Sequence, residues 1–167
     1  MVRDFTDRLI DRLSELQPEL EMADLQVTAR LSRLGRHVAL RDEEVFGRLD
    51  LNRGEVGVLS ALRVAGPPHR LSPTGLGKGL MLSSAGVTSR LDRLERRGLV
   101  ARLPDPGDRR GVIVELTDRG AELVDAAVRA NVANGRQLLS RLEPDEIQAF
   151  ETLLRKVLAG LELPQVE

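Results

Sequence analysis

The chain has 167 residues, which is enough for one domain of ordinary size with its own core. Hydrophobic residues make up 41% and charged residues 31%, a composition that argues against disorder and against membrane spans. The chain has no cysteine and only two histidines, which excludes disulfides and thiol chemistry and makes a structural metal site or other cofactor unexpected. The N-terminus MVRDFTDRLIDRL lacks the apolar stretch of a secretory signal, so we expect a cytoplasmic protein.

Apolar spacing predicts three helices in the N-terminal part. Residues 3–16 carry apolar side chains at helical intervals, and a longer pattern predicts a second helix over about 21–47. Asn52 and Glu55 have the spacing of a capping box, which opens a third helix. That helix is expected to end at Gly66-Pro67-Pro68, because this sequence breaks helices.

The next stretch, SPTGLGKGLMLSS over residues 72–84, allows two interpretations. A phosphate-binding loop requires G-x-x-x-x-G-K-[ST] after a buried strand, and here Ser72 stands at the first Gly and Gly79 at the Ser/Thr. A short helix fits better, because Ser72 suits the N-cap and Pro73 the first turn. Each glycine costs a helix about 1 kcal/mol relative to alanine, so this helix must depend on packing. The sequence therefore disfavours a nucleotide-binding enzyme.

A second short helix is predicted from Ser83 or Ser84 to Gly98, after a turn at Met81-Leu82. Alternating residues on both sides of PDPGDRRG then predict a β-hairpin, the only strand signal in the chain. Two short helices joined by a tight turn and followed by a basic hairpin form a winged helix-turn-helix. We therefore predict a mainly α fold with a small β-hairpin wing.

Two long amphipathic helices are predicted after the hairpin. Thr117 caps the first, which runs to about Leu142, and Pro144 begins the second. The sequence offers no second layer to cover the terminal helices, so we expect them to pack against a second copy of the chain; the alternative is that they fold back on their own chain. The predicted divisions are N-terminal dimerisation helices (1–50), a winged lobe (51–117) and C-terminal dimerisation helices (118–167).

Positive charge gathers in one segment of this chain. Residues 70–111 contain nine basic and four acidic residues, whereas the whole chain has a net charge of −1. A positive segment in an otherwise acidic protein is expected where one face meets phosphate. Arginine to guanine is the commonest specific contact in the major groove, and arginine on a protruding turn suits a narrow minor groove.

The predicted DNA contacts lie on the second short helix and on the hairpin tip. The helix buries one apolar stripe and presents small polar and basic residues opposite it. We expect Asp108 to hold one of the tip arginines in place. The alternatives without a DNA-binding role are a helix face that contacts only solvent and an exposed Asp-Arg pair at the tip that recognises nothing specific. The candidate residues are Ser83, Ser84, Thr88, Ser89, Arg90, Arg93 and Arg96 of the helix and Asp108, Arg109 and Arg110 of the tip.

The stretch LSSAGVTSRLDRLERRGLVARLPDPGDRRGVIVELTDRG resembles the core of MarR-type transcriptional regulators. Asp108-Arg109-Arg110 matches the family's wing motif, and Leu116-Thr117-Asp118-Arg119-Gly120 matches its helix start. The resemblance covers nearly the whole chain and implies a triangular homodimer held by its terminal helices. It also implies binding to a pseudo-palindromic operator, usually as a repressor released by a small phenolic or anionic effector, with no catalytic residues. The alternative is a winged-helix protein-interaction module that does not bind DNA.

The extra N-terminal helix is similar to a branch that includes urate-responsive regulators. This chain lacks the tryptophan of that branch, and Gly57 stands where the branch has aspartate. Arg90 matches a ligand arginine of the branch but lacks its partners. Urate is therefore not predicted as the effector, and the absence of cysteine excludes the thiol-oxidation mechanism of other members.

Overall fold

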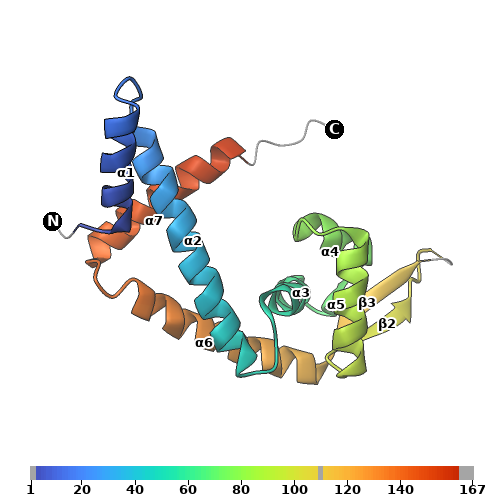
Figure 1. Cartoon of the computed structure of the whole chain (residues 1–167). Helices are drawn as coiled ribbons and strands as arrows, with labels where there is room; N and C mark the ends of the chain where they lie inside the picture. Colours follow the sequence, from blue (N-terminus) through green and yellow to red (C-terminus); the bar gives the residue numbers. More distant parts are fainter. Residues whose placement is uncertain (1–2, 109–110, 162–167) are drawn as a thin grey trace.

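The structure is a computed structural model that describes residues 3–108 and 111–161 (Figure 1). Its described helices are α1 (Phe5–Leu16), α2 (Ala23–Gly47), α3 (Arg53–Val64), α4 (Pro73–Gly79), α5 (Ser84–Arg96), α6 (Asp118–Leu138) and α7 (Pro144–Leu161). Its described strands are β1 (Arg70–Leu71), β2 (Val100–Pro104) and β3 (Val112–Leu116). The predicted mainly α fold with a β-hairpin wing is confirmed.

The molecule has two regions (Figure 1). The winged lobe, residues 51–117, contains α3, α4, α5 and the small sheet. The arm contains α1, α2 and α7 and lies to one side of the lobe. Helix α6 begins at the end of the sheet and crosses under α3 and α2 toward the arm, so it joins the two regions.

One apolar core holds the lobe together. Helices α3 and α5 each contribute three leucine or valine side chains that are at most 2% exposed: Val58, Leu59, Leu62, Val87, Leu91 and Leu94. Phe46 of α2 and Val124 of α6 belong to the same core, which therefore continues across both predicted boundaries of the lobe. Burying one such side chain stabilises a fold by about 1.5–3 kcal/mol.

Polar caps fix where the lobe helices start. The predicted capping box is present, because the Glu55 amide donates to Asn52 Oδ1 and the Asn52 amide donates to Glu55 Oε2, both at 2.9 Å. The hydroxyls of Ser72, Ser83 and Thr117 each accept a hydrogen bond from the amide three residues later. These caps confirm the predicted helix starts.

The glycine-rich segment forms helix α4, as the helix interpretation predicts. Leu76 is 1% exposed and anchors this helix in the core of the lobe. A Cβ on Gly77 would lie only 3.3 Å from the Leu82 carbonyl oxygen, so this glycine lets α4 approach the turn before α5 closely. Packing against the core of the lobe thus stabilises a helix whose residues have weak intrinsic helix propensity.

Two details of the predicted elements are wrong. The hairpin is joined by β1, which pairs antiparallel with β3 through Arg70↔Glu115 and Leu71↔Val114. Two residues are too short to show the alternation that marks a strand in a sequence. The helix expected to reach Leu142 ends at Leu138, because a turn follows in which the Leu142 amide donates to the Leu139 carbonyl.

Candidate nucleic-acid interface

Helix α5 has the two faces that the sequence predicts. Its apolar stripe is buried in the lobe, while the opposite face is open to solvent. That exposed face begins with small polar side chains beside the helix N-terminus and ends with arginines; its candidate residues are Ser83, Ser84, Thr88, Ser89, Arg93 and Arg96. The small residues leave room for close approach, and the helix N-terminus favours a negatively charged partner.

Arg93 has a partner on α3 that the sequence pattern does not predict. Its Nε lies 2.7 Å from Oε1 of Glu55, a carboxylate with 0% exposure at the start of α3. The Arg93 side chain itself remains 48% exposed on the outer face of α5. The structure therefore ties one candidate contact residue to the interior of the lobe while keeping it at the surface.

Arg90 lies partly buried between α3 and α5 rather than on the open face. Its Nη1 donates to the Gly86 carbonyl at 2.8 Å. A Cβ on Gly54 would overlap the Arg90 guanidinium, so the absence of a side chain at Gly54 gives Arg90 its place. Of the predicted contact residues on α5, Arg90 is the least accessible to a ligand on the outer face.

The count of basic residues in segment 70–111 overstates its outward positive charge. Arg102 of β2 bonds to Asp92 and Glu95 of α5, each at 2.6 Å, and this links the wing to the helix. Partial burial lowers the pKa of Arg102, but the hydrogen bonds and charges of these two carboxylates outweigh it and raise the pKa above its usual value. Arg97 pairs with Asp50 at 3.2 Å, and Arg70 pairs with Glu115.

The hairpin tip is a hydrogen-bonded turn. The Asp105 amide donates to the Gly111 carbonyl at 3.0 Å, and the Gly111 amide donates to the Asp108 carbonyl at 2.8 Å. Asp108 is exposed on this turn. Arg109 and Arg110 lie outside the described residues, so their predicted DNA contacts, and the predicted pairing with Asp108, stay predictions.

Lys78 on α4 is a further candidate, which belongs to the basic segment 70–111 but is not among the predicted DNA-contact residues. It lines a shallow cleft of about 240 Å³ between α4 and α5, together with Thr74, Ser84 and Thr88. Within residues 3–108 and 111–161, Lys78 forms no ion pair. An exposed ammonium next to three hydroxyls suits a phosphate group.

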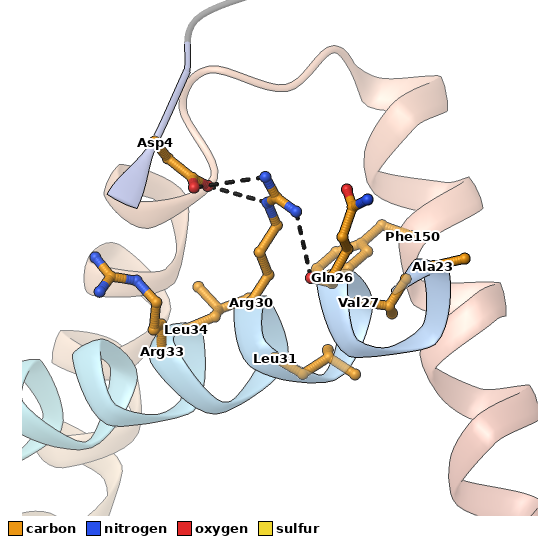
Figure 2. A pocket seen from close by; sticks show the side chains of 9 residues that line it. All are labelled: Asp4, Ala23, Gln26, Val27, Arg30, Leu31, Arg33, Leu34 and Phe150. Carbon is orange, nitrogen blue, oxygen red and sulfur yellow. Dashed lines mark hydrogen bonds and ion pairs between the residues drawn. The ribbon is translucent and has the colours of Figure 1, made fainter. Parts of the chain in front are cut away.

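A larger cavity lies in the arm, between α2 and α7 (Figure 2), whereas α5 belongs to the lobe (Figure 1). It has a volume of about 610 Å³ and is lined mainly by apolar residues such as Val27, Leu31 and Phe150. Arg30 points along its wall, but its guanidinium is engaged by Asp4 at 3.0 Å and Asp7 at 2.6 Å. These ion pairs fasten α1 to α2, which is a structural role.

The described part of the chain contains no cluster of three or more metal-ligating side chains. None of its helices combines the length and the apolar character needed to cross a bilayer.

Helices α4 and α5 form a helix-turn-helix, and the polar face of α5 is open to solvent beside a β-wing. This combination defines the winged helix-turn-helix class of DNA-binding proteins. The chain belongs to the MarR family. The family model "MarR family" matches residues 49–111, which span most of the winged lobe. This match, together with the relatives described next, confirms the predicted resemblance, and with it the prediction of a DNA-binding transcriptional regulator rather than an enzyme.

Relatives and solved structures agree with this assignment. The chain is 36% identical over 141 residues to the HTH-type transcriptional regulator PecS of Dickeya dadantii, covering 84% of this chain and 85% of that protein. It is 34% identical over 143 residues to the transcriptional repressor NicR of Pseudomonas putida, covering 83% and 89%.

Two similar structures were solved with DNA. Sco3205 of Streptomyces coelicolor, a MarR family regulator in complex with DNA, has a TM-score of 0.76 and 25% identity, covering 88% of this chain and 96% of that one. A mutant of MarR from E. coli, complexed with operator DNA, has a TM-score of 0.71 and 31% identity, covering 82% and 97%.

Proposed function

We propose that two copies of this chain bind a pseudo-palindromic operator as a cytoplasmic repressor. Each copy inserts α5 into a major groove and sets its wing tip beside that groove. The observation that carries this proposal is the exposed face of α5, which is polar and basic and backed by a fully buried stripe. The relative named as a repressor and the two similar structures solved with DNA support it.

The contacts divide by side-chain chemistry. Ser84, Thr88 and Ser89 approach the base edges, because they are small and lie near the N-terminus of α5. Lys78 and Arg96 contact phosphates on either side of the groove. Arg110 is the wing contact in this proposal, and Asp108 is its acidic partner.

The arm supplies the dimer contact in this proposal. Helix α7 has no buried residue among residues 144–161, and its Leu153 and Leu161 are 62% and 77% exposed. Phe5 of α1 is 51% exposed. A second copy would remove these side chains from water and hold two α5 helices about 34–36 Å apart, the spacing of successive major grooves.

We further propose that a small anionic phenol releases the DNA. A cleft of about 340 Å³ lies where the end of α5 meets α6, and its lining consists of two arginines, one carboxylate and three apolar residues: Arg97, Arg119, Glu122, Leu49, Leu123 and Ala126. Arg97 is already paired with Asp50, so Arg119 is the arginine that matches an anion, and the apolar wall of the cleft matches an aromatic ring. A ligand in this cleft touches both the lobe and the helix that joins it to the arm, so it would favour another lobe spacing.

A titration with the DNA upstream of the chain's own gene tests the proposal. We expect specific binding whose affinity falls steeply as salt rises, because phosphate contacts release counterions. Binding that is absent, or insensitive to salt, would favour the alternative of a protein-interaction module. A screen of phenolic acids against the complex then tests release, with Arg119→Ala expected to lose the response while it still binds DNA.

A further inference from the structure

We propose that Glu55 is a positioning residue for DNA recognition, because it fixes the guanidinium of Arg93 at the surface of α5. This inference rests on the proposed insertion of α5 into the major groove. Glu55 cannot touch DNA itself, since its side chain is completely buried at the start of α3. Any effect of Glu55 on base preference must therefore pass through another residue.

The two carboxylate oxygens of Glu55 have different tasks. Oε2 accepts the hydrogen bond of the capping box from the Asn52 amide at 2.9 Å. Oε1 is also buried and accepts no hydrogen bond within the described residues, yet it lies 2.7 Å from Nε of Arg93. A buried carboxylate is costly without a compensating charge. Arg93 provides that charge, so its Nε stays next to Glu55.

About half of the Arg93 side chain stays open to solvent on α5. The side chain is 48% exposed, and its two Nη groups form no hydrogen bond with any residue that the structure describes. These groups carry four N–H donors in a planar fork, the geometry that reads the acceptor edge of guanine. Because the Nε end is already held, the fork loses less conformational freedom when it meets a base.

This arrangement gives a physical reason for the major-groove contact that the sequence predicts for Arg93. A free arginine on a helix surface would sample many rotamers and neutralise any nearby phosphate. An arginine held at one end by the core of the lobe presents its fork in one direction. Base preference at one operator position is then set jointly by a surface residue and by a residue of α3 that is 38 positions earlier in the chain.

The test is a double-mutant cycle with Glu55→Gln and Arg93→Gln in the full-length chain. Glutamine keeps the size of Glu55 and its acceptor for the Asn52 amide but removes the charge that holds Arg93. Affinity is measured for the preferred operator duplex and for duplexes with single base-pair changes, well below the melting temperature of each variant. We expect each single variant to lose about tenfold in affinity and its preference at one base pair. The double variant should be no weaker than Arg93→Gln alone.

Glu44→Gln is the matched control, because Glu44 is an exposed carboxylate of α2 that pairs with Arg48 at 2.7 Å. It should leave affinity and base preference unchanged. Arg93→Lys is the second probe: it keeps a positive charge beside Glu55 but lacks the fork, so it should fold normally and lose the base preference.

Three results would overturn the proposal. One is a Glu55→Gln variant that keeps the wild-type base preference, and another is an effect of Glu55→Gln that persists in the Arg93→Gln background. The third is wild-type preference in Arg93→Lys. Failure of the wild-type chain to bind any operator duplex would instead overturn the proposed function, on which this inference rests.

Discussion

The lobe and the arm bury their apolar side chains in different ways. In the lobe, Leu59 and Leu94 are completely buried by neighbours from the same chain. In the arm, Phe5 is half-exposed and Leu153 is 62% exposed, although both belong to clear amphipathic patterns. The lobe therefore completes its apolar core within one chain, whereas the arm exposes apolar side chains that require a partner surface from outside this copy.

Truncation of one leucine in the lobe and one in the arm should have very different effects on stability. Leu59→Ala should lower the free energy of unfolding by about 2–5 kcal/mol, because it leaves a cavity in the core of the lobe. Leu153→Ala should leave the unfolding of the lobe nearly unchanged and weaken self-association instead. Urea unfolding and sedimentation of both variants provide the measurements. Equal losses of stability would mean that the arm is as self-contained as the lobe.

Charge placed on the arm should separate the two copies. Leu153→Glu with Val157→Glu puts two carboxylates on side chains of α7 that are 62% and 54% exposed. We expect monomers and a loss of operator affinity of about 100-fold. A monomer contacts only one half-site and so loses the gain in affinity that comes from binding two linked half-sites. Light scattering and a gel-shift titration measure the two effects. A variant that stays dimeric would show that α7 lies outside the interface.

Ser89→Ala tests the exposed face of α5. We expect a loss of about 1–3 kcal/mol in discrimination at one base pair, with little change at the others. Ser140→Ala is the control, because Ser140 is an exposed serine beyond the end of α6. Competition binding against single-substitution duplexes measures the effect. A uniform loss at every position would assign Ser89 to the backbone rather than to a base.

Lys78→Ala should have a smaller and sequence-independent effect. Removal of one phosphate contact weakens all duplexes similarly and lowers the slope of log affinity against log salt by about 1. Lys156→Ala, on the exposed surface of α7, removes the same charge from the arm. If both variants change the slope equally, the cleft between α4 and α5 does not face the DNA backbone.

The smallest expected effect concerns the bridge between lobe and α6. Arg63 of α3 donates two hydrogen bonds of 3.0 Å to Asp125 of α6, and this pairing lowers the pKa of Asp125 below its usual value. The bridge therefore stabilises the fold fully above the unfolded pKa of about 3.9, and its contribution is lost as pH falls through the lower folded pKa. With Asp125→Asn, the free energy of unfolding should fall slightly less steeply as the pH is lowered into the acid range. An unchanged slope in this pH range would mean that the bridge contributes nothing measurable.

Local signals in the sequence are sufficient to predict most helices and strands of the lobe. Capping residues such as Asn52, Ser72 and Thr117 act on amides three positions away, so their patterns can be read directly. The sequence does not predict strand β1, because two residues form a strand only when β3 lies beside them.

The candidate site could be predicted less completely, because charge pairing depends on the fold. The exposed face of α5 follows from helical periodicity alone. The link from Arg93 to Glu55 joins residues 38 positions apart, and it exists only because α3 packs on α5. A count of charges cannot show that Arg102 is already neutralised by α5.

The most direct test of two lobes acting on one duplex is the affinity for operators whose half-sites are moved apart. Two α5 helices held by a common arm require half-sites about one helical turn apart. We expect insertion of about five base pairs between the half-sites to reduce affinity to the level of a single half-site, and insertion of about ten to restore part of it. Affinity that does not change with spacing would contradict the account, because it would mean that each lobe binds alone.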